Sequence, residues 1–164
     1  MTRKWLVVYT KPQHEVKSYN YLCMHNIKAY LPLYKELRQW SDRKKWVEKP
    51  LFPGYLFVFV SNKEYFNVLS CPSIIKYIFH NGVAATVDNR IIEGIEKQIK
   101  INNGENIEAV DVDFEYGQEI VLKTGPFKGL TGKLVQFKGK HKIAIELECM
   151  NRRILIETRK AHVV

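Results

Sequence analysis

The chain has 164 residues, of which 46% are hydrophobic and 26% are charged. This length suffices for one compact domain or two small ones, and the composition is that of a soluble globular protein. The net charge of +9 favours a polyanionic partner such as nucleic acid, although a generally solvated basic surface would carry the same charge. No apolar run reaches the length of a membrane span and no signal peptide is evident, so we expect a cytoplasmic protein without membrane contact.

The first part of the chain, residues 1–102, alternates strand and helix signals. Residues 5–10 are a short run of β-forming residues, which predicts a buried strand. A helix is predicted to follow. Its core face is expected to carry four residues that recur at spacings of three and four: Val16, Tyr19, Cys23 and Ile27. The next predicted elements are, in chain order, a strand at 29–37, a basic hairpin at 38–50, a strand at 51–60, a short helix capped by Asn62, a strand at 73–79 and a helix after Asp88. This order predicts an α+β domain with an antiparallel-rich sheet covered by helices.

An acidic segment separates this part from the rest of the chain. Residues 101–119 contain six Asp and Glu residues and no Lys or Arg, whereas the segments before and after are both basic. We therefore expect two domains joined by an acidic linker, with boundaries at 1–102, 103–116 and 117–164.

The last part of the chain has the pattern of a small β-barrel. Its strand signals are closely spaced, at 119–123, 130–137, 142–148 and 153–158. The first two flank a tight turn made by Gly125, Pro126, Phe127, Gly129 and Gly132, with Gly117 ahead of it. Glycine permits positive φ or a bulge where a strand coils sharply, although an ordinary hairpin turn would have a similar composition. The β-branched strands predict that this domain is a barrel, not a helical hairpin, in the free protein.

The turn and one strand of the first domain together carry a family resemblance. The turn resembles the KOW motif of NusG-family transcription factors and of several ribosomal proteins. Residues 51–58, which contain Phe-Pro-Gly-Tyr followed by hydrophobic residues, resemble a strand of the NusG N-terminal (NGN) domain. The likeness covers nearly the whole chain and is greatest to short specialised paralogues of the RfaH and UpxY type. It implies an NGN-like domain followed by a small SH3-like β-barrel, the KOW domain.

The resemblance implies a transcription elongation or antitermination factor without enzymatic activity or cofactor. In the family the NGN domain binds the clamp of bacterial RNA polymerase, so that the enzyme pauses or terminates less. The KOW domain recruits a small-subunit ribosomal protein or Rho. We expect a monomeric specialised paralogue; a general NusG factor and a KOW-containing protein that binds RNA or the ribosome are the alternatives.

Three aromatic residues match the polymerase-docking surface of the family: Phe52, Tyr55 and Phe57. An exposed aromatic patch is a good interface anchor. Alternation along the strand alone fits core packing equally well.

A second set of residues matches the loop, early helix and hairpin that face upstream or non-template DNA in the specialised members: Lys11, His14, Trp40, Arg43, Lys44, Lys45 and Trp46. Flexible cations neutralise phosphates, and indole rings stack on unpaired bases. A solvated basic loop braced by two packed indoles is the alternative.

Catalytic and metal-binding sites are not expected. No carboxylate cluster, P-loop or nucleophile with a base is visible, and the three cysteines lack the spacing of a zinc site. Five acidic residues are interpreted as solvated surface or helix caps: Glu15, Asp42, Glu48, Glu64 and Asp88.

The chain departs from the family pattern in two places. One is residues 66–69, near the place where RfaH has His-Thr-Thr, and the other is the basic and apolar segment 151–156.

Overall fold

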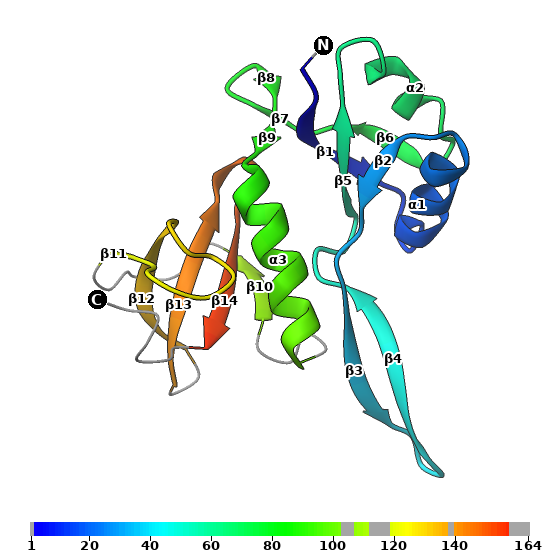
Figure 1. Cartoon of the computed structure of the whole chain (residues 1–164). Coiled ribbons are helices and arrows are strands. Elements are labelled where there is room, and N and C mark those ends of the chain that lie inside the picture. Colours follow the sequence, from blue (N-terminus) through cyan, green and yellow to red (C-terminus); the bar gives the residue numbers. More distant parts are fainter. Residues whose placement is uncertain (1, 103–106, 112–118, 138–139, 158–164) are drawn as a thin grey trace. The chain divides into compact units, whose positions relative to one another are not determined.

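The structure, a computed structural model, describes residues 2–102, 107–111, 119–137 and 140–157. The chain divides into two compact units: unit 1 is residues 1–32 with 50–89, and unit 2 is residues 33–49 with 90–164. Antiparallel strands dominate both units, which confirms the predicted α+β class (Figure 1). Within the described ranges, no helix has the length and apolar character needed to cross a membrane.

Unit 1 is an antiparallel sheet with two helices. Its elements are β1 (Lys4–Thr10), α1 (Glu15–Met24), β2 (Lys28–Tyr30), β5 (Tyr55–Val60), α2 (Tyr65–Leu69), β6 (Ile74–Tyr77), β7 (Phe79–His80), β8 (Val83–Ala84) and β9 (Thr86–Val87). The strand order is β2-β5-β1-β6, and β9 also pairs with β1. The central strands β1 and β5 therefore join segments that lie about fifty residues apart in the chain.

Both helices of unit 1 lie on the same side of this sheet (Figure 1). On that side Val8 of β1 lies opposite Leu56 of β5 and Tyr77 of β6, and all three are buried. The Tyr77 hydroxyl donates a hydrogen bond to the backbone carbonyl of Tyr65 in α2, and the two rings stack with their centroids 4.0 Å apart. Aliphatic burial together with this stacked pair holds α2 on the sheet.

The core face of α1 differs from the prediction by one position. Glu15, Ser18 and Leu22 are buried, whereas Val16 and Cys23, which were expected in the core, are exposed. The polar side chains Glu15 and Ser18 make hydrogen bonds within the unit, so their burial leaves these groups paired. Tyr19 is half-buried and Ile27 is buried, so the apolar periodicity was wrong for Val16 and Cys23.

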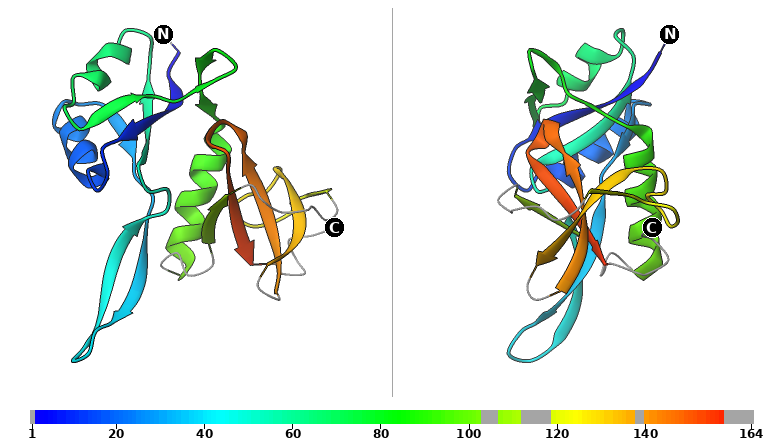
Figure 2. Two further views of the ribbon diagram at one scale, coloured as in Figure 1. Left: turned by 180° about the vertical axis from the view of Figure 1, so that it is seen from behind. Right: turned by 90° about the vertical axis from the view of Figure 1, so that its left-hand side faces the viewer.

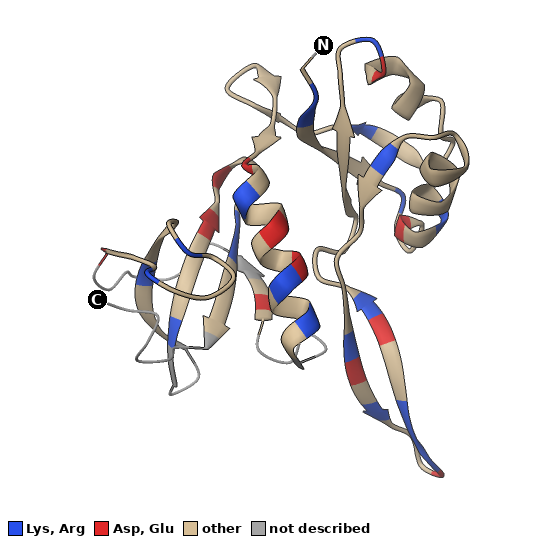
Figure 3. Ribbon diagram, viewed as in Figure 1, with Lys and Arg blue, Asp and Glu red and all other residues tan. Residues whose placement is uncertain are grey.

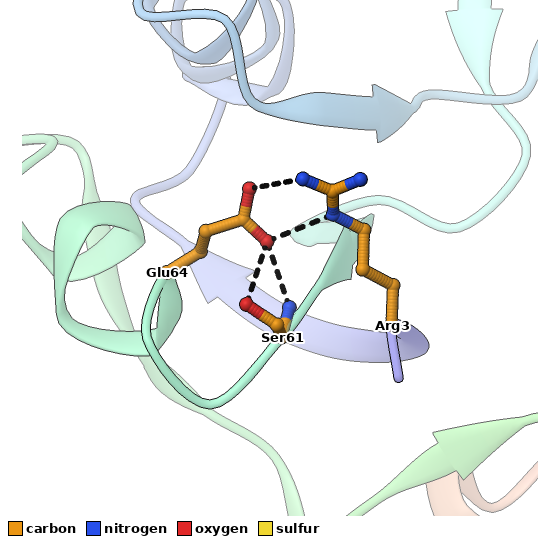
Figure 4. Close-up of polar contacts among 3 residues, drawn as sticks. All are labelled: Arg3, Ser61 and Glu64. Atoms are coloured by element: carbon orange, nitrogen blue, oxygen red, sulfur yellow. Dashed lines mark hydrogen bonds and ion pairs between the residues drawn. The ribbon is translucent and has the colours of Figure 1, made fainter. Parts of the chain in front are cut away.

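The N-cap residue of α2 is Glu64 instead of the predicted Asn62. Its side chain contacts Arg3 and Ser61 (Figure 4). The Glu64 carboxylate accepts hydrogen bonds from the Arg3 guanidinium at 3.1 and 3.2 Å, and from the amide and hydroxyl of Ser61 at 2.8 and 3.0 Å. These bonds, that from Arg3 foremost, lower the pKa of Glu64 to about 2. The Glu64 carboxylate therefore joins Ser61, the residue after β5, to Arg3, the residue before β1, and makes no capping hydrogen bond to the helix itself.

A two-stranded hairpin occupies residues 33–50. Its strands are β3 (Leu33–Gln39) and β4 (Lys44–Pro50), which pair with each other and with no other described strand (Figure 1). The hairpin itself was predicted. The expected single strand at 29–37 is instead divided into β2 and β3 by Leu31 and Pro32, because a proline cannot donate to a strand ladder.

The second sheet contains the strands predicted for a barrel. Unit 2 continues with α3 (Asn89–Asn102), β10 (Ile107–Asp111), β11 (Glu119–Val121), β12 (Thr131–Phe137), β13 (Lys140–Leu147), a 3-10 turn (Glu148–Met150) and β14 (Arg152–Glu157). The strand order is β10-β14-β13-β12-β11, with all pairs antiparallel. β10 lies inside the expected linker 103–116, so this segment contributes a strand to the sheet. The domain boundaries as a whole stay a prediction.

Helix α3 packs within unit 2 against the turn that precedes β12. It runs alongside the strands of the second sheet in each view (Figures 1 and 2). The helix was predicted to follow Asp88, and its side chains Ile92 and Ile95 are buried. A Cβ atom on Gly94 would lie 2.4 Å from the Phe127 ring, so glycine at this position permits the close approach of helix and ring.

Candidate functional site

One face of the sheet in unit 1 carries a row of aromatic side chains. The register of β1 and β5 places Trp5 opposite Phe59 and Tyr9 opposite Tyr55. Their ring centroids lie 5.1 and 5.5 Å apart, a range in which aromatic pairs attract each other. Phe57 lies between these pairs on β5, on the same face because side chains alternate along a strand. We call Trp5, Tyr9, Tyr55, Phe57 and Phe59 the aromatic face.

The structure buries two of the three residues that were expected to dock on polymerase. Phe52 is 1% exposed and Phe57 is 0% exposed, and their rings pack edge to face with centroids 5.7 Å apart. The expectation of an exposed surface is therefore wrong for these two residues, because the loop before β5 packs Phe52 against Phe57. Tyr55 is half-buried beside Tyr9 and offers accessible ring area. Its role in polymerase binding stays a prediction.

Sequence reasoning missed the residues that β1 and the neighbouring strands add to this face. Alternation along β1 could have shown that Trp5 and Tyr9 share a side, but only the register shows that this side continues onto β5. The ammonium group of Lys28 on β2 lies 5.0 Å from the Phe59 ring centroid and 5.7 Å from that of Trp5, which are cation–π distances. Lys76 on β6 is exposed and lies opposite Tyr9.

Lys11 and His14 lie together in the turn between β1 and α1. Lys11 is exposed, and its backbone amide donates to the Ser73 carbonyl at 2.9 Å. His14 is half-buried, and its Nδ1 lies 2.8 Å from the Pro12 carbonyl oxygen. The ammonium group of Lys11 can reach a phosphate, whereas the His14 ring is held by its own turn.

The other five predicted nucleic-acid contacts lie at the tip of the β3–β4 hairpin: Trp40, Arg43, Lys44, Lys45 and Trp46. Trp40 and Trp46 are 42% and 53% exposed, which contradicts the alternative that they are packed indoles. The turn is closed by the Trp40 amide, which donates to the Arg43 carbonyl at 2.8 Å. The Arg43 guanidinium lies 5.8 Å from the Trp40 ring centroid. The three cations and Asp42 are all exposed, so basic residues outnumber acidic ones at the tip (Figure 3).

The base of the hairpin is braced by an ion pair between its strands. Lys49 of β4 lies 2.7 Å from the carboxylate of Glu36 on β3, and Arg38 lies 3.6 Å from the same oxygen. The close Lys49 ammonium is the main reason that the pKa of Glu36 lies below its usual value. This carboxylate therefore engages cations on the strands and leaves those of the tip available for a polyanion.

The KOW-like turn has the geometry that its glycines predict. Gly125 and Gly129 have φ of +88° and +87°, in the left-handed region that favours glycine. Phe127 is 1% exposed, and its carbonyl accepts a hydrogen bond from the Leu130 amide at 3.1 Å. A Cβ on Gly132 would lie 2.7 Å from an Ile143 methyl carbon, so close packing requires glycine there. Pro126 is half-buried between Gly125 and Phe127, and Gly117 lies outside the described residues.

Two ionisable side chains in the described residues have pKa values raised chiefly by burial. Burial raises the pKa of the Tyr77 phenol and that of the Cys149 thiol. Among the residues that the structure describes, no three His, Cys, Asp or Glu side chains gather where they could hold a metal ion. The chemistry that the described surfaces offer is aromatic contact and positive charge.

Comparison with known proteins identifies the family of the chain. Residues 3–96 match the family model described as transcription termination factor NusG. The chain is 21% identical to the transcription termination/antitermination protein NusG of Staphylococcus carnosus, over 94% of this chain and 91% of that protein. It is 20% identical to the protein of the same name from Halalkalibacterium halodurans, over 96% and 95%. A solved structure described as domain interaction in Thermotoga maritima NusG shares the fold, with a TM-score of 0.52 and 21% identity over 96% of this chain and 94% of that one. Because the family model covers more than half of the sequence, the chain belongs to the NusG family.

Proposed function

We propose that this chain is a transcription termination or antitermination factor without catalytic activity, and that it binds bacterial RNA polymerase through the aromatic face. The observation that carries this proposal is the Tyr9–Tyr55 ring pair, half-buried on the sheet face opposite the helices. Tyrosine contributes a large apolar area and a polar hydroxyl at low entropic cost, which suits an interface anchor. Related proteins named transcription termination/antitermination protein support the assignment to transcription.

The polymerase element that we propose for this face is the clamp, and the proposed effect is reduced pausing or termination. The hairpin tip and Lys11 then contact upstream or non-template DNA. The exposed cations of the tip supply phosphate contacts, and Trp40 and Trp46 supply stacking surfaces. The KOW domain would recruit a further factor, for which a small-subunit ribosomal protein and Rho are the candidates.

Within the family we propose a specialised paralogue over a general NusG factor. The chain carries 26 Lys and Arg residues against 17 Asp and Glu residues, an excess that favours direct DNA contact. On α2, Phe66 is 73% exposed near the position where RfaH carries polar residues. A second contact of the RfaH kind would therefore differ in chemistry.

Binding of the full-length chain to bacterial core RNA polymerase tests the proposal. We expect Tyr55→Ala to weaken binding about thirtyfold or more, which corresponds to about 2 kcal/mol for a lost anchor. The matched control is Phe79→Ala, because Phe79 is an aromatic residue of the same unit that is 58% exposed and lies outside the aromatic face. Thermal unfolding of each variant establishes that it is folded.

Two results would contradict the proposal. Equal binding by wild type and Tyr55→Ala would remove the aromatic face as the docking surface. Failure of the wild type to bind polymerase, with capture of RNA or ribosomal subunits instead, would support a KOW-containing RNA- or ribosome-binding protein.

A further inference from the structure

A buried carboxylate reaches from α1 to the turn that leads into β5. Glu15, the first residue of α1, is 7% exposed. Its Oε1 accepts a hydrogen bond from the backbone amide of Gly54 at 2.8 Å, across 39 positions of the chain. A hydrogen bond to a charged acceptor is stronger than a neutral one, especially where water is excluded. Glu15 is therefore not solvated surface, as the sequence suggested, but a fixed contact to this turn.

Both the backbone amide and the backbone carbonyl of Gly54 are hydrogen-bonded. Its amide donates to Glu15, and its carbonyl accepts a hydrogen bond from the Thr10 amide at 2.8 Å. Its φ of +86° lies in the left-handed region, and a Cβ there would lie 3.0 Å from the Tyr9 ring. The next residue is Tyr55, which pairs with Tyr9 on the aromatic face. The turn conformation therefore sets where β5 begins and where the accessible Tyr9–Tyr55 pair lies.

We propose that Glu15 is a positioning residue for the aromatic face. It fixes the Gly54 turn and so presets the Tyr9–Tyr55 pair for its partner, without touching that partner. This inference rests on the proposed polymerase binding. Preorganisation of a contact surface raises affinity because less ordering is needed on binding.

A second buried side chain on the same helix separates positioning from general stability. Ser18 is 0% exposed, and its hydroxyl lies 2.7 Å from the hydroxyl of Ser73 and 2.8 Å from the His14 carbonyl. The contact with Ser73 joins α1 to the segment before β6, and the bond to His14 lies within the first turn of α1. Neither involves the turn at residues 52–55. Ser18→Ala therefore removes a buried hydrogen bond of α1 while leaving the bonds of Gly54 in place.

The experiment compares Glu15→Ala, Glu15→Gln and Ser18→Ala in the full-length chain. Three quantities are measured: the Kd for core RNA polymerase, the exchange rate of the Gly54 amide by NMR, and the thermal unfolding temperature. We expect Glu15→Ala to raise Kd about tenfold, equivalent to about 1.4 kcal/mol, and to speed Gly54 exchange. Glu15→Gln retains an oxygen acceptor and should stay closer to wild type in both. Ser18→Ala should lower the unfolding temperature but leave Kd within about threefold of wild type, because its bonds lie elsewhere.

Each contrary result has a distinct meaning. Wild-type Kd for Glu15→Ala with a faster-exchanging Gly54 amide would overturn the positioning role. So would an equal rise in Kd for Ser18→Ala at a matched loss of stability. If Glu15→Ala does not fold, Glu15→Asp replaces it, because the shorter side chain moves the carboxylate away from Gly54 by one methylene. A wild-type Kd together with faster exchange of the Gly54 amide in this variant would again overturn the positioning role. Wild-type binding by Tyr55→Ala would instead refute the proposed docking face itself.

Discussion

The sharpest quantitative prediction concerns the tip of the β3–β4 hairpin. Arg43, Lys44 and Lys45 are all exposed there, while the Glu36–Lys49 pair occupies the strands behind them. If each of the three cations neutralises one phosphate, replacing all three with alanine removes three counterion-release contacts. Each contact contributes about 0.7 to 0.9 to the slope of log K against log salt concentration, so the slope should become shallower by roughly two to three units.

The assay is binding of the full-length chain to a DNA scaffold with an unpaired segment, titrated over a range of salt concentrations. The matched control removes the same charge elsewhere, by Lys63→Ala, Lys97→Ala and Lys100→Ala together, because these lysines are also exposed. We expect the control to keep a slope within about one unit of wild type, since long-range charge effects are screened by salt. A hairpin triple variant with the wild-type slope would refute phosphate contact and leave the tip as a solvated basic surface.

Two further predictions concern stability. The pKa of Glu64 is lowered to about 2 by Arg3 and then Ser61, so the stabilisation it gives is present above its ordinary pKa and is lost as pH falls toward 2. In acid unfolding, Glu64→Gln should reduce the loss of unfolding free energy between neutral pH and pH 2 by about 1 kcal/mol. The value is small because Arg3 is exposed. The same pH dependence in the variant and the wild type would contradict this role of Glu64. Gly132→Ala should cost about 2 kcal/mol in denaturant unfolding, since the added methyl would lie 2.7 Å from a carbon of the fully buried Ile143. Wild-type stability of this variant would show that the sheet relaxes there.

The second sheet was the part of the fold most accessible to sequence reasoning. Along β13 the β-branched residues Ile143 and Ile145 are followed by Glu146 and Leu147, and β-branched residues with apolar and polar positions in alternation are typical of a strand. The glycine-rich turn was equally informative, because only a glycine tolerates the positive φ found at Gly125 without strain. Local chemistry determines both features, so no knowledge of distant contacts was needed.

The candidate site was harder to predict from the sequence, because it depends on which distant segments pack against each other. Alternation shows that Tyr55 and Phe57 share a side of β5, but it does not show that Phe52 folds back onto Phe57 and buries it. The α1 prediction failed at Val16 and Cys23 for a related reason. The burial of Glu15 could be predicted only if it were known that the amide of Gly54, far along the chain, needs a hydrogen-bond acceptor.

The same register that builds the aromatic face also limits what can bind there. Lys28 lies over Phe59 toward one edge of the sheet, and Lys76 lies opposite Tyr9 at the other. A partner must therefore place apolar groups against the Tyr9–Tyr55 pair and avoid bringing its own cations to either edge, because unpaired like charges at an interface oppose binding. In the proposed docking, Tyr9 and Tyr55 are the accessible contacts, because Phe57 beside them is fully buried. Lys76 is beside this tyrosine pair, whereas Lys28 flanks the Trp5–Phe59 pair. We therefore expect charge at the edges to select among apolar partners, while the tyrosine pair supplies the contact area.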